Sequence, residues 1–109
     1  MPPVGGSQDT FRLCGKDIVA RDGRVATEDG VLAGSALDMA GAVRNCVRLL
    51  GMNLSQALRL ASATPAAFLG LSDRLGRLAP GCRADIVALD PEQVRVLATW
   101  VAGEADSPD

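Results

Sequence analysis

In the first quarter of the chain, short apolar runs alternate with sequences typical of turns. Residues 11–27, FRLCGKDIVARDGRVAT, contain β-prone pieces interrupted at Gly15-Lys16-Asp17 and at Asp22-Gly23. Asp-Gly between apolar pieces is typical of a β-hairpin, and Glu28-Asp29-Gly30 indicates a further turn. The pattern therefore predicts two or three short strands in this segment.

Apolar residues then repeat at intervals of three or four positions. They are Ala36, Met39, Ala40, Val43, Val47 and Leu50. This spacing predicts an amphipathic helix, with Ser35 as its N-cap and Asp38 completing a capping box. Gly51 predicts the end of the helix, because glycine readily takes the left-handed conformation found there.

Two further helices are expected before residue 71. Asn53 with Gln56 three residues later predicts the capped start of the first of them. Its apolar face would consist of Leu54, Ala57, Leu58 and Ala61. Thr64-Pro65 predicts the end of that helix and the start of a short third one, since proline suits the first helical turn. Gly70 would close it.

The apolar pattern becomes strand-like near the end of the chain. Residues 84–89 and 94–101 read as strands joined by a turn at Asp90-Pro91, and Trp100 is expected to pack on a sheet face. A β-hairpin, three helices and two C-terminal strands make a small α+β domain, or a piece of a larger protein.

Composition narrows the class of protein and its partners. The 109 residues suffice for one domain, and a hydrophobic content of 48% with 3% aromatic residues indicates an aliphatic core. The net charge is −2 and the arginines are scattered singly, so we expect neither nucleic acid nor a membrane surface as a partner. No apolar run approaches the ~20 residues of a membrane span, and no signal peptide is recognisable.

The cysteines and the chain ends add two expectations. Cys14, Cys46 and Cys82 are widely spaced without a CxxC pair, so we expect reduced, mostly buried thiols and a cytoplasmic protein. The polar, glycine- and proline-containing ends, residues 1–9 and 105–109, are expected to be flexible.

The residue types exclude the common self-sufficient catalytic sites. The chain has no histidine, and its acidic residues do not cluster at ligand spacing, whereas a catalytic zinc site needs three protein ligands. Gly34-Ser35 lacks the rest of a nucleophile elbow, and no Walker loop or GxGxxG occurs. We therefore expect no catalytic and no metal-binding residue in this chain.

Four segments nevertheless carry a resemblance to a known family. They are MPPVGG at residues 1–6, GVLAGSALDMAGAVRNCVRLLG at 30–51, LRLASATPAAFLGL at 58–71 and GRLAPGCRADIVALD at 76–90. Together they resemble the C-terminal part of the N-acetylglucosamine-6-phosphate deacetylases, in the amidohydrolase superfamily. The last segment marks only the superfamily, and the second and third make the narrower assignment. Cys82 stands where a lysine is common.

The resemblance implies a fold and a domain division. The parent enzyme is expected to be an α/β protein, a metal-dependent hydrolase with a (β/α)₈ barrel and an appended β-sandwich. Residues 1–75 would end the barrel domain, residues 76–104 would supply C-terminal strands of the sandwich, and residues 105–109 would form a flexible tail. The metal ligands and the catalytic aspartate would lie upstream of Met1, so this chain would be an inactive fragment.

The resemblance also implies a chemistry. In the parent, a divalent metal of the Zn or Fe type would activate water and polarise the acetamide carbonyl. An aspartate would act as general base and then as general acid. The products would be acetate and glucosamine-6-phosphate.

Leu32, Ala33 and Gly34 are the candidate substrate-binding residues, because the family's matching loop contacts the amino sugar. Small residues let main-chain groups approach a ligand closely. The alternative is that Gly34 only turns the chain into the capped helix. Packing, solvation or capping roles are favoured for Ser35, Arg44 and Asn45, and a strand role for Asp85.

A chain cut from a barrel would expose apolar faces and strand edges. We therefore expect it to associate with the N-terminal remainder of the barrel or to form a homo-oligomer. Two other hypotheses stay open: a piece of a different amidohydrolase, and a non-catalytic module that binds a sugar phosphate or a protein.

Overall fold

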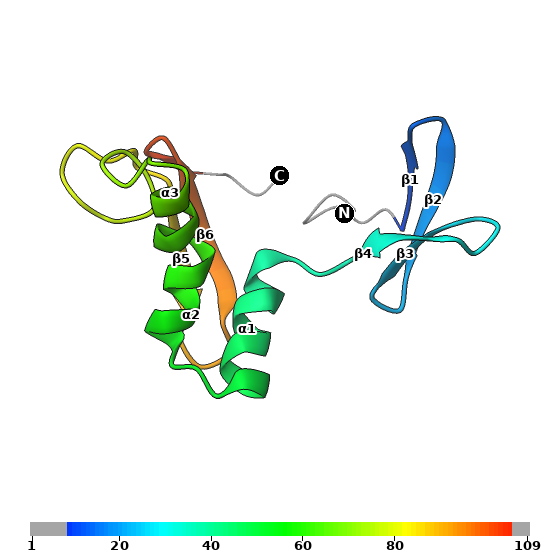
Figure 1. The fold of residues 1–109 in the computed structure, drawn as a ribbon, viewed down its shortest axis with the longest axis horizontal. Coiled ribbons are helices and arrows are strands. Elements are labelled where there is room, and N and C mark those ends of the chain that lie inside the picture. The colour runs from blue at the N-terminus through cyan, green and yellow to red at the C-terminus, as the bar shows by residue number, and fades with distance from the viewer. Residues whose placement is uncertain (1–8, 106–109) are drawn as a thin grey trace. The chain divides into compact units, whose positions relative to one another are not determined.

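The chain folds into two units, each with its own sheet. The structure, a computed structural model, describes residues 9–105. The units are Met1–Asp38 and Met39–Asp109, and Figure 1 shows that strands β1 to β4 form the first, whereas the helices and the remaining strands form the second.

The first unit is an antiparallel meander of four short strands in sequential order. The strands are β1 (Thr10–Leu13), β2 (Lys16–Arg21), β3 (Arg24–Thr27) and β4 (Leu32–Ser35). The β2–β3 turn at Asp22-Gly23 has positive φ at both residues, 53° and 75°, which matches the hairpin that the sequence predicts. The turn predicted at residues 28–30 is also present, whereas strand β4 was not expected.

Three helices begin the second unit, as the sequence predicts. They are α1 (Met39–Leu50), α2 (Leu54–Ala61) and α3 (Ala63–Phe68). The expected capping box starts α2: the Gln56 amide donates to Asn53 Oδ1 at 2.9 Å, and the Asn53 amide donates to Gln56 Oε1 at 3.3 Å. Gly51 and Gly70 have positive φ, 67° and 70°, so both helix ends use the left-handed conformation.

An antiparallel sheet of order β5-β6-β7 completes this unit. Its strands are β5 (Ile86–Asp90), β6 (Arg95–Val101) and β7 (Glu104–Ala105). The Asp90 carboxylate caps the β5–β6 turn, because Oδ1 accepts hydrogen bonds from the amides of Glu92 at 2.9 Å and Gln93 at 3.0 Å. The two predicted strands are thus confirmed with shifted bounds, because Ala84 and Asp85 precede β5 and Val94 lies in the turn. Strand β7 is additional.

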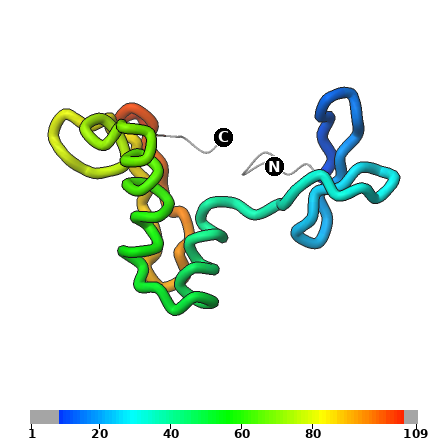
Figure 2. Tube along the Cα trace, in the orientation of Figure 1, coloured from blue at the N-terminus to red at the C-terminus, as the bar shows by residue number. Residues whose placement is uncertain are grey.

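The core of the second unit joins the helices to this hairpin. Val43 of α1, Ala57 of α2 and Val94 of the β5–β6 turn are buried against one another. The partly buried residues packed on them are Cys46, Val47, Leu54, Leu58, Ala61 and Leu89. Figure 2 shows α1 and α2 running in opposite directions beside strands β5 and β6. The core is aliphatic, as the composition indicates.

Some expectations need correction. Cys14 is exposed, although Cys46 and Cys82 are half-buried and all three are free thiols. Cys14 occupies a turn with φ of 50° between β1 and β2, a position where side chains commonly face solvent. Ala105, expected in a flexible tail, pairs with Trp100 in β7; residues 1–8 and 106–109 lie outside the described part.

The described residues form an α+β arrangement and no closed barrel. The assignment of residues 1–75 to a barrel domain and 76–104 to a β-sandwich concerns a larger protein and stays a prediction. Within residues 9–105, no helix has the length and apolar character of a membrane span.

Candidate functional site

The candidate segment Leu32–Gly34 lies in a strand rather than a loop. It forms most of β4, at the edge of the meander, and within residues 9–105 its one strand partner is β3. The register places Gly34 opposite Val25 and Leu32 opposite Ala26, so Ala33 is an extra residue in a β-bulge. A bulge re-aims the side chains around it and is common beside binding sites.

Nothing in the described chain requires glycine at position 34. Its φ is not in the left-handed region, and a Cβ added there would meet no atom within 4 Å. The alternative that Gly34 turns the chain into a helix is wrong, because α1 begins only at Met39. Leu32 is 68% exposed. Strand β4 therefore presents an apolar side chain at Leu32 and an open backbone position at Gly34.

Ser35 is not the N-cap of α1. It pairs with Arg24 in the meander, and the next residue, Ala36, still donates its amide to Gly23 O at 3.2 Å. Ser35 Oγ instead accepts a hydrogen bond from the Leu37 amide at 3.1 Å, a local turn. The pairing with β3 outcompetes helix formation here, because extended pairing and helical φ/ψ exclude each other at the same residues.

A turn closed by Thr27 fixes where β4 begins. Thr27 Oγ1 accepts from the Val31 amide at 3.1 Å and donates to the Val31 carbonyl at 3.2 Å. The Thr27 amide donates to the same carbonyl at 2.9 Å. A hydrogen bond from the Thr27 hydroxyl, with a smaller contribution from the Asp29 amide, lowers the pKa of the Asp29 carboxyl.

Thr27 is a residue that the sequence interpretation missed. The available signal was a threonine directly before Glu28-Asp29-Gly30, since threonine hydroxyls commonly bond to the backbone of tight turns.

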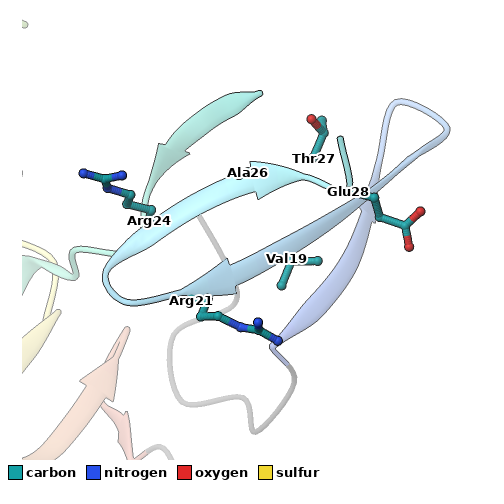
Figure 3. Close-up of a pocket in the computed structure, with 6 residues that line it drawn as sticks. All are labelled: Val19, Arg21, Arg24, Ala26, Thr27 and Glu28. Carbon is teal, nitrogen blue, oxygen red and sulfur yellow. The ribbon is translucent and has the colours of Figure 1, made fainter. Parts of the chain in front are cut away.

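A shallow groove lies on one side of the meander. Its volume is ≈ 500 Å³, and its lining residues are Val19, Arg21, Arg24, Ala26, Thr27 and Glu28. Arg21 and Arg24 are opposite each other in register, but Figure 3 shows their guanidinium groups pointing in different directions. Because an anion site needs donors that converge on one point, these arginines do not form one.

A second hollow, of ≈ 430 Å³, lies in the loop that follows α3. It is lined by Leu71, Arg74, Leu75, Gly81, Cys82 and Arg83. Two of its lining residues have partners inside the loop: the Arg83 amide donates to Arg74 O at 2.9 Å, and Cys82 Sγ lies 3.6 Å from Asp73 O. These contacts hold the loop in shape.

Arg44 and Asp85 have structural contacts. Arg44 Nη1 donates to Val94 O at 2.7 Å, which ties α1 to the β5–β6 turn. Asp85 Oδ1 accepts from the Ala102 amide at 2.9 Å and lies 3.1 Å from Arg83 Nε. The Arg44 contact matches the packing role expected from the sequence, whereas Asp85 lies just before β5 rather than in the strand. Asn45 is exposed on α1.

The donor set of the described residues does not suit a metal ion. Within residues 9–105, no three His, Cys, Asp or Glu side chains come together as a possible site, and the full sequence has no histidine. Residues 9–105 thus bring no such set of ligands together, and no reaction step is assigned to a metal ion in this part of the chain.

Comparison with known proteins identifies the family to which the chain is similar. The model of the amidohydrolase family matches residues 18–106. The N-acetylgalactosamine-6-phosphate deacetylase of Shewanella sp. (strain ANA-3) is 43% identical over 104 residues, which are 95% of this chain and 26% of that protein. A relative from Escherichia coli (strain K12) is 40% identical over 107 residues, 98% of this chain and 64% of the relative.

Solved structures agree with the sequence matches. The crystal structure of N-acetylglucosamine-6-phosphate deacetylase from Pasteurella multocida superposes with a TM-score of 0.76 at 33% identity. The match covers 93% of this chain and 26% of that structure. The chain thus spans between about a quarter and two thirds of the length of these relatives.

Proposed function

Because the chain belongs to the amidohydrolase family, we propose that it forms part of a deacetylase that acts on 2-acetamido-sugar 6-phosphates. Water would cleave the acetamide bond of N-acetylglucosamine-6-phosphate, releasing acetate and glucosamine-6-phosphate. The observation that carries this proposal is the likeness to the Pasteurella enzyme over 93% of the chain.

In this proposal, residues 1–109 bind and position rather than catalyse. Leu32, Ala33 and Gly34 would contact the amino sugar, with the Leu32 side chain as an apolar wall and the backbone at Gly34 as the point of close approach. The exposure of Leu32 and the open space beside Gly34 support this role. The metal ligands and the general base would belong to polypeptide outside these residues, so the chain alone would be inactive.

The missing part of the enzyme would also be the partner of this chain. Large apolar side chains are exposed on its helices, among them Leu49 at 76% and Phe68 at 90%. Such surfaces favour association, since burying apolar area is worth ~25 cal/mol per Å². We propose that the barrel remainder covers part of this surface and that the assembled enzyme is a cytoplasmic homo-oligomer, for which the three free thiols are suitable.

A second substrate has its own support. The Shewanella relative, at 43% identity, is named as an N-acetylgalactosamine-6-phosphate deacetylase. The two sugars differ only in the configuration of one ring hydroxyl, so one deacetylation chemistry serves both. Parallel assays with the two 6-phosphates would decide between them.

The test uses a hybrid enzyme in which this chain replaces the 104 matching residues of the Shewanella deacetylase. We expect the hybrid to release acetate from one or both sugar phosphates, and the 109-residue chain to release none. An inactive hybrid that is folded and carries metal would contradict the proposal, as would activity of the purified chain by itself.

Gly34 allows a sharper test in the same hybrid. Gly34→Ala should change the free energy of unfolding by less than about 0.5 kcal/mol, because the new methyl group meets no atom. It should raise KM about tenfold if substrate approaches the backbone there.

The matched control for Gly34 is Gly23→Ala, at a turn residue with φ of 75°. It should lower stability by about 1 kcal/mol and leave KM unchanged. An unchanged KM in Gly34→Ala would remove Gly34 from the substrate contacts.

A further inference from the structure

The Thr27 side chain supplies two of the hydrogen bonds that hold the β3–β4 turn. The Thr27 hydroxyl and amide make three hydrogen bonds to the two backbone groups of Val31, at 3.1, 3.2 and 2.9 Å. The Gly30 amide closes the other side by donating to Thr27 O at 2.9 Å. Val31 directly precedes Leu32, so the turn ends where the candidate segment begins.

In the described residues, the register of β4 also depends on its pairing with β3 and on the bond from the Ala36 amide to Gly23 O at 3.2 Å. This strand has four residues and one neighbour, β3. A shift of one residue would move Leu32 and Gly34 to the opposite faces of the sheet. The bulge at Ala33 already offsets the pairing between Val25-Gly34 and Ala26-Leu32. The Thr27 bonds to Val31 lie at the start of β4, where they favour the observed pairing over a shifted one.

The hydroxyl has two possible acceptors for its single hydrogen. One is the Val31 carbonyl, and the other is the Asp29 carboxylate. The bond from the Val31 amide to Thr27 Oγ1 uses an oxygen lone pair. It therefore persists whichever acceptor takes the hydrogen, so the link to Val31 is robust.

We propose that Thr27 is a positioning residue, whose hydroxyl fixes the register in which Leu32–Gly34 meet the sugar phosphate. This inference rests on the proposed function and extends it to a side chain that is not itself in the candidate segment.

The test compares Thr27→Val and Thr27→Ser in the hybrid enzyme defined above. Valine keeps the shape and removes the oxygen, so KM should rise about fivefold with kcat unchanged. Serine keeps the oxygen and should restore KM to within about twofold of the unsubstituted hybrid. Thr10→Val, the same substitution on the other edge strand of the meander, is the control and should leave KM unchanged.

Amide hydrogen exchange in the same protein tests the Thr27–Val31 contact independently of the enzyme kinetics. Thr27→Val should speed exchange of the Val31 amide, whereas Thr10→Val should not. Thr27→Ala serves as a second variant without the hydroxyl, in case valine unfolds the turn, and its KM should rise as well.

Failure of the proposed function and failure of the Thr27 role give different results. If the unsubstituted hybrid deacetylates neither sugar, the proposed function is wrong, and the role of Thr27 is wrong with it. If the hybrid is active and the valine and alanine variants keep its KM, or if serine behaves as valine does, only the positioning role is overturned.

Discussion

Arg44 Nη1 donates a hydrogen bond to the carbonyl oxygen of Val94 at 2.7 Å, although the two residues are 50 positions apart in the sequence. The same guanidinium nitrogen lies 3.4 Å from Gln93 O. Through this contact a residue of α1 holds the β5–β6 turn, so the packing of the helices on the second sheet includes a charge-assisted bond as well as apolar contacts.

Loss of the Arg44 contact should destabilise the second unit. We expect Arg44→Met to lower the free energy of unfolding by about 2 kcal/mol, because a partly buried carbonyl loses a charged donor. Arg48→Met, at an exposed position of the same helix, should change it by less than about 0.5 kcal/mol. Urea denaturation of both variants checks this, and equal stabilities would contradict it.

Val94 combines burial with an unfavourable backbone conformation. It is 3% exposed and has φ of 51°, a region that β-branched residues rarely adopt. Val94→Ala should therefore cost about 1 kcal/mol less than Val43→Ala, its partner in the same core, because removing the branch relieves part of the strain. Thermal unfolding of the two variants measures the difference; a larger loss at Val94 would show that its strain is negligible.

The capping box of α2 should contribute measurably to stability. We expect Asn53→Ala to cost about 1 kcal/mol, since the Gln56 amide loses its acceptor at the helix start. The control is Ser55→Ala, at an exposed position in the first turn of the same helix. It should leave the free energy of unfolding unchanged or raise it slightly. The denaturant midpoints of the two variants are compared with that of the unsubstituted protein. Equal midpoints for the two variants would rule out a capping contribution.

Acid should weaken the β5–β6 turn through Asp90. Hydrogen bonds from the amides of Gln93 and then Glu92 lower the pKa of this carboxyl from its ordinary value of 3.8. A carboxyl whose pKa is lower in the folded state stabilises the fold above its unfolded pKa. That stabilisation is lost as the pH falls below about 3.8 and through the folded pKa.

A pH titration can isolate this effect. Asp90→Asn keeps an acceptor oxygen but cannot titrate, so it should flatten the decline in stability below pH 3.8. Carboxyl chemical shifts followed by NMR should place the midpoint of the Asp90 titration below the ordinary value of 3.8. A midpoint at the ordinary value would contradict the hydrogen-bonding account.

Sequence by itself determined the features that depend on neighbouring residues. The Asp22-Gly23 hairpin, the Asn53–Gln56 capping box and the helix end at Gly51 all appear as predicted. Each is fixed by a φ preference or by a hydrogen bond that spans three residues or fewer, and such preferences are nearly independent of the rest of the fold. The motifs at residues 30–90 likewise sufficed to indicate the amidohydrolase family.

Only the tertiary structure decided the state of residues 32–38. Ser35 followed by an apolar helical spacing reads as a helix start, yet Leu32–Ser35 pair with β3 and α1 begins at Met39. The helical preference there is worth tenths of a kcal/mol per residue, whereas the strand has pairing bonds and the Thr27 turn to hold it. The Arg44–Val94 contact is equally invisible in the sequence, because it exists only after two segments 50 residues apart have packed together.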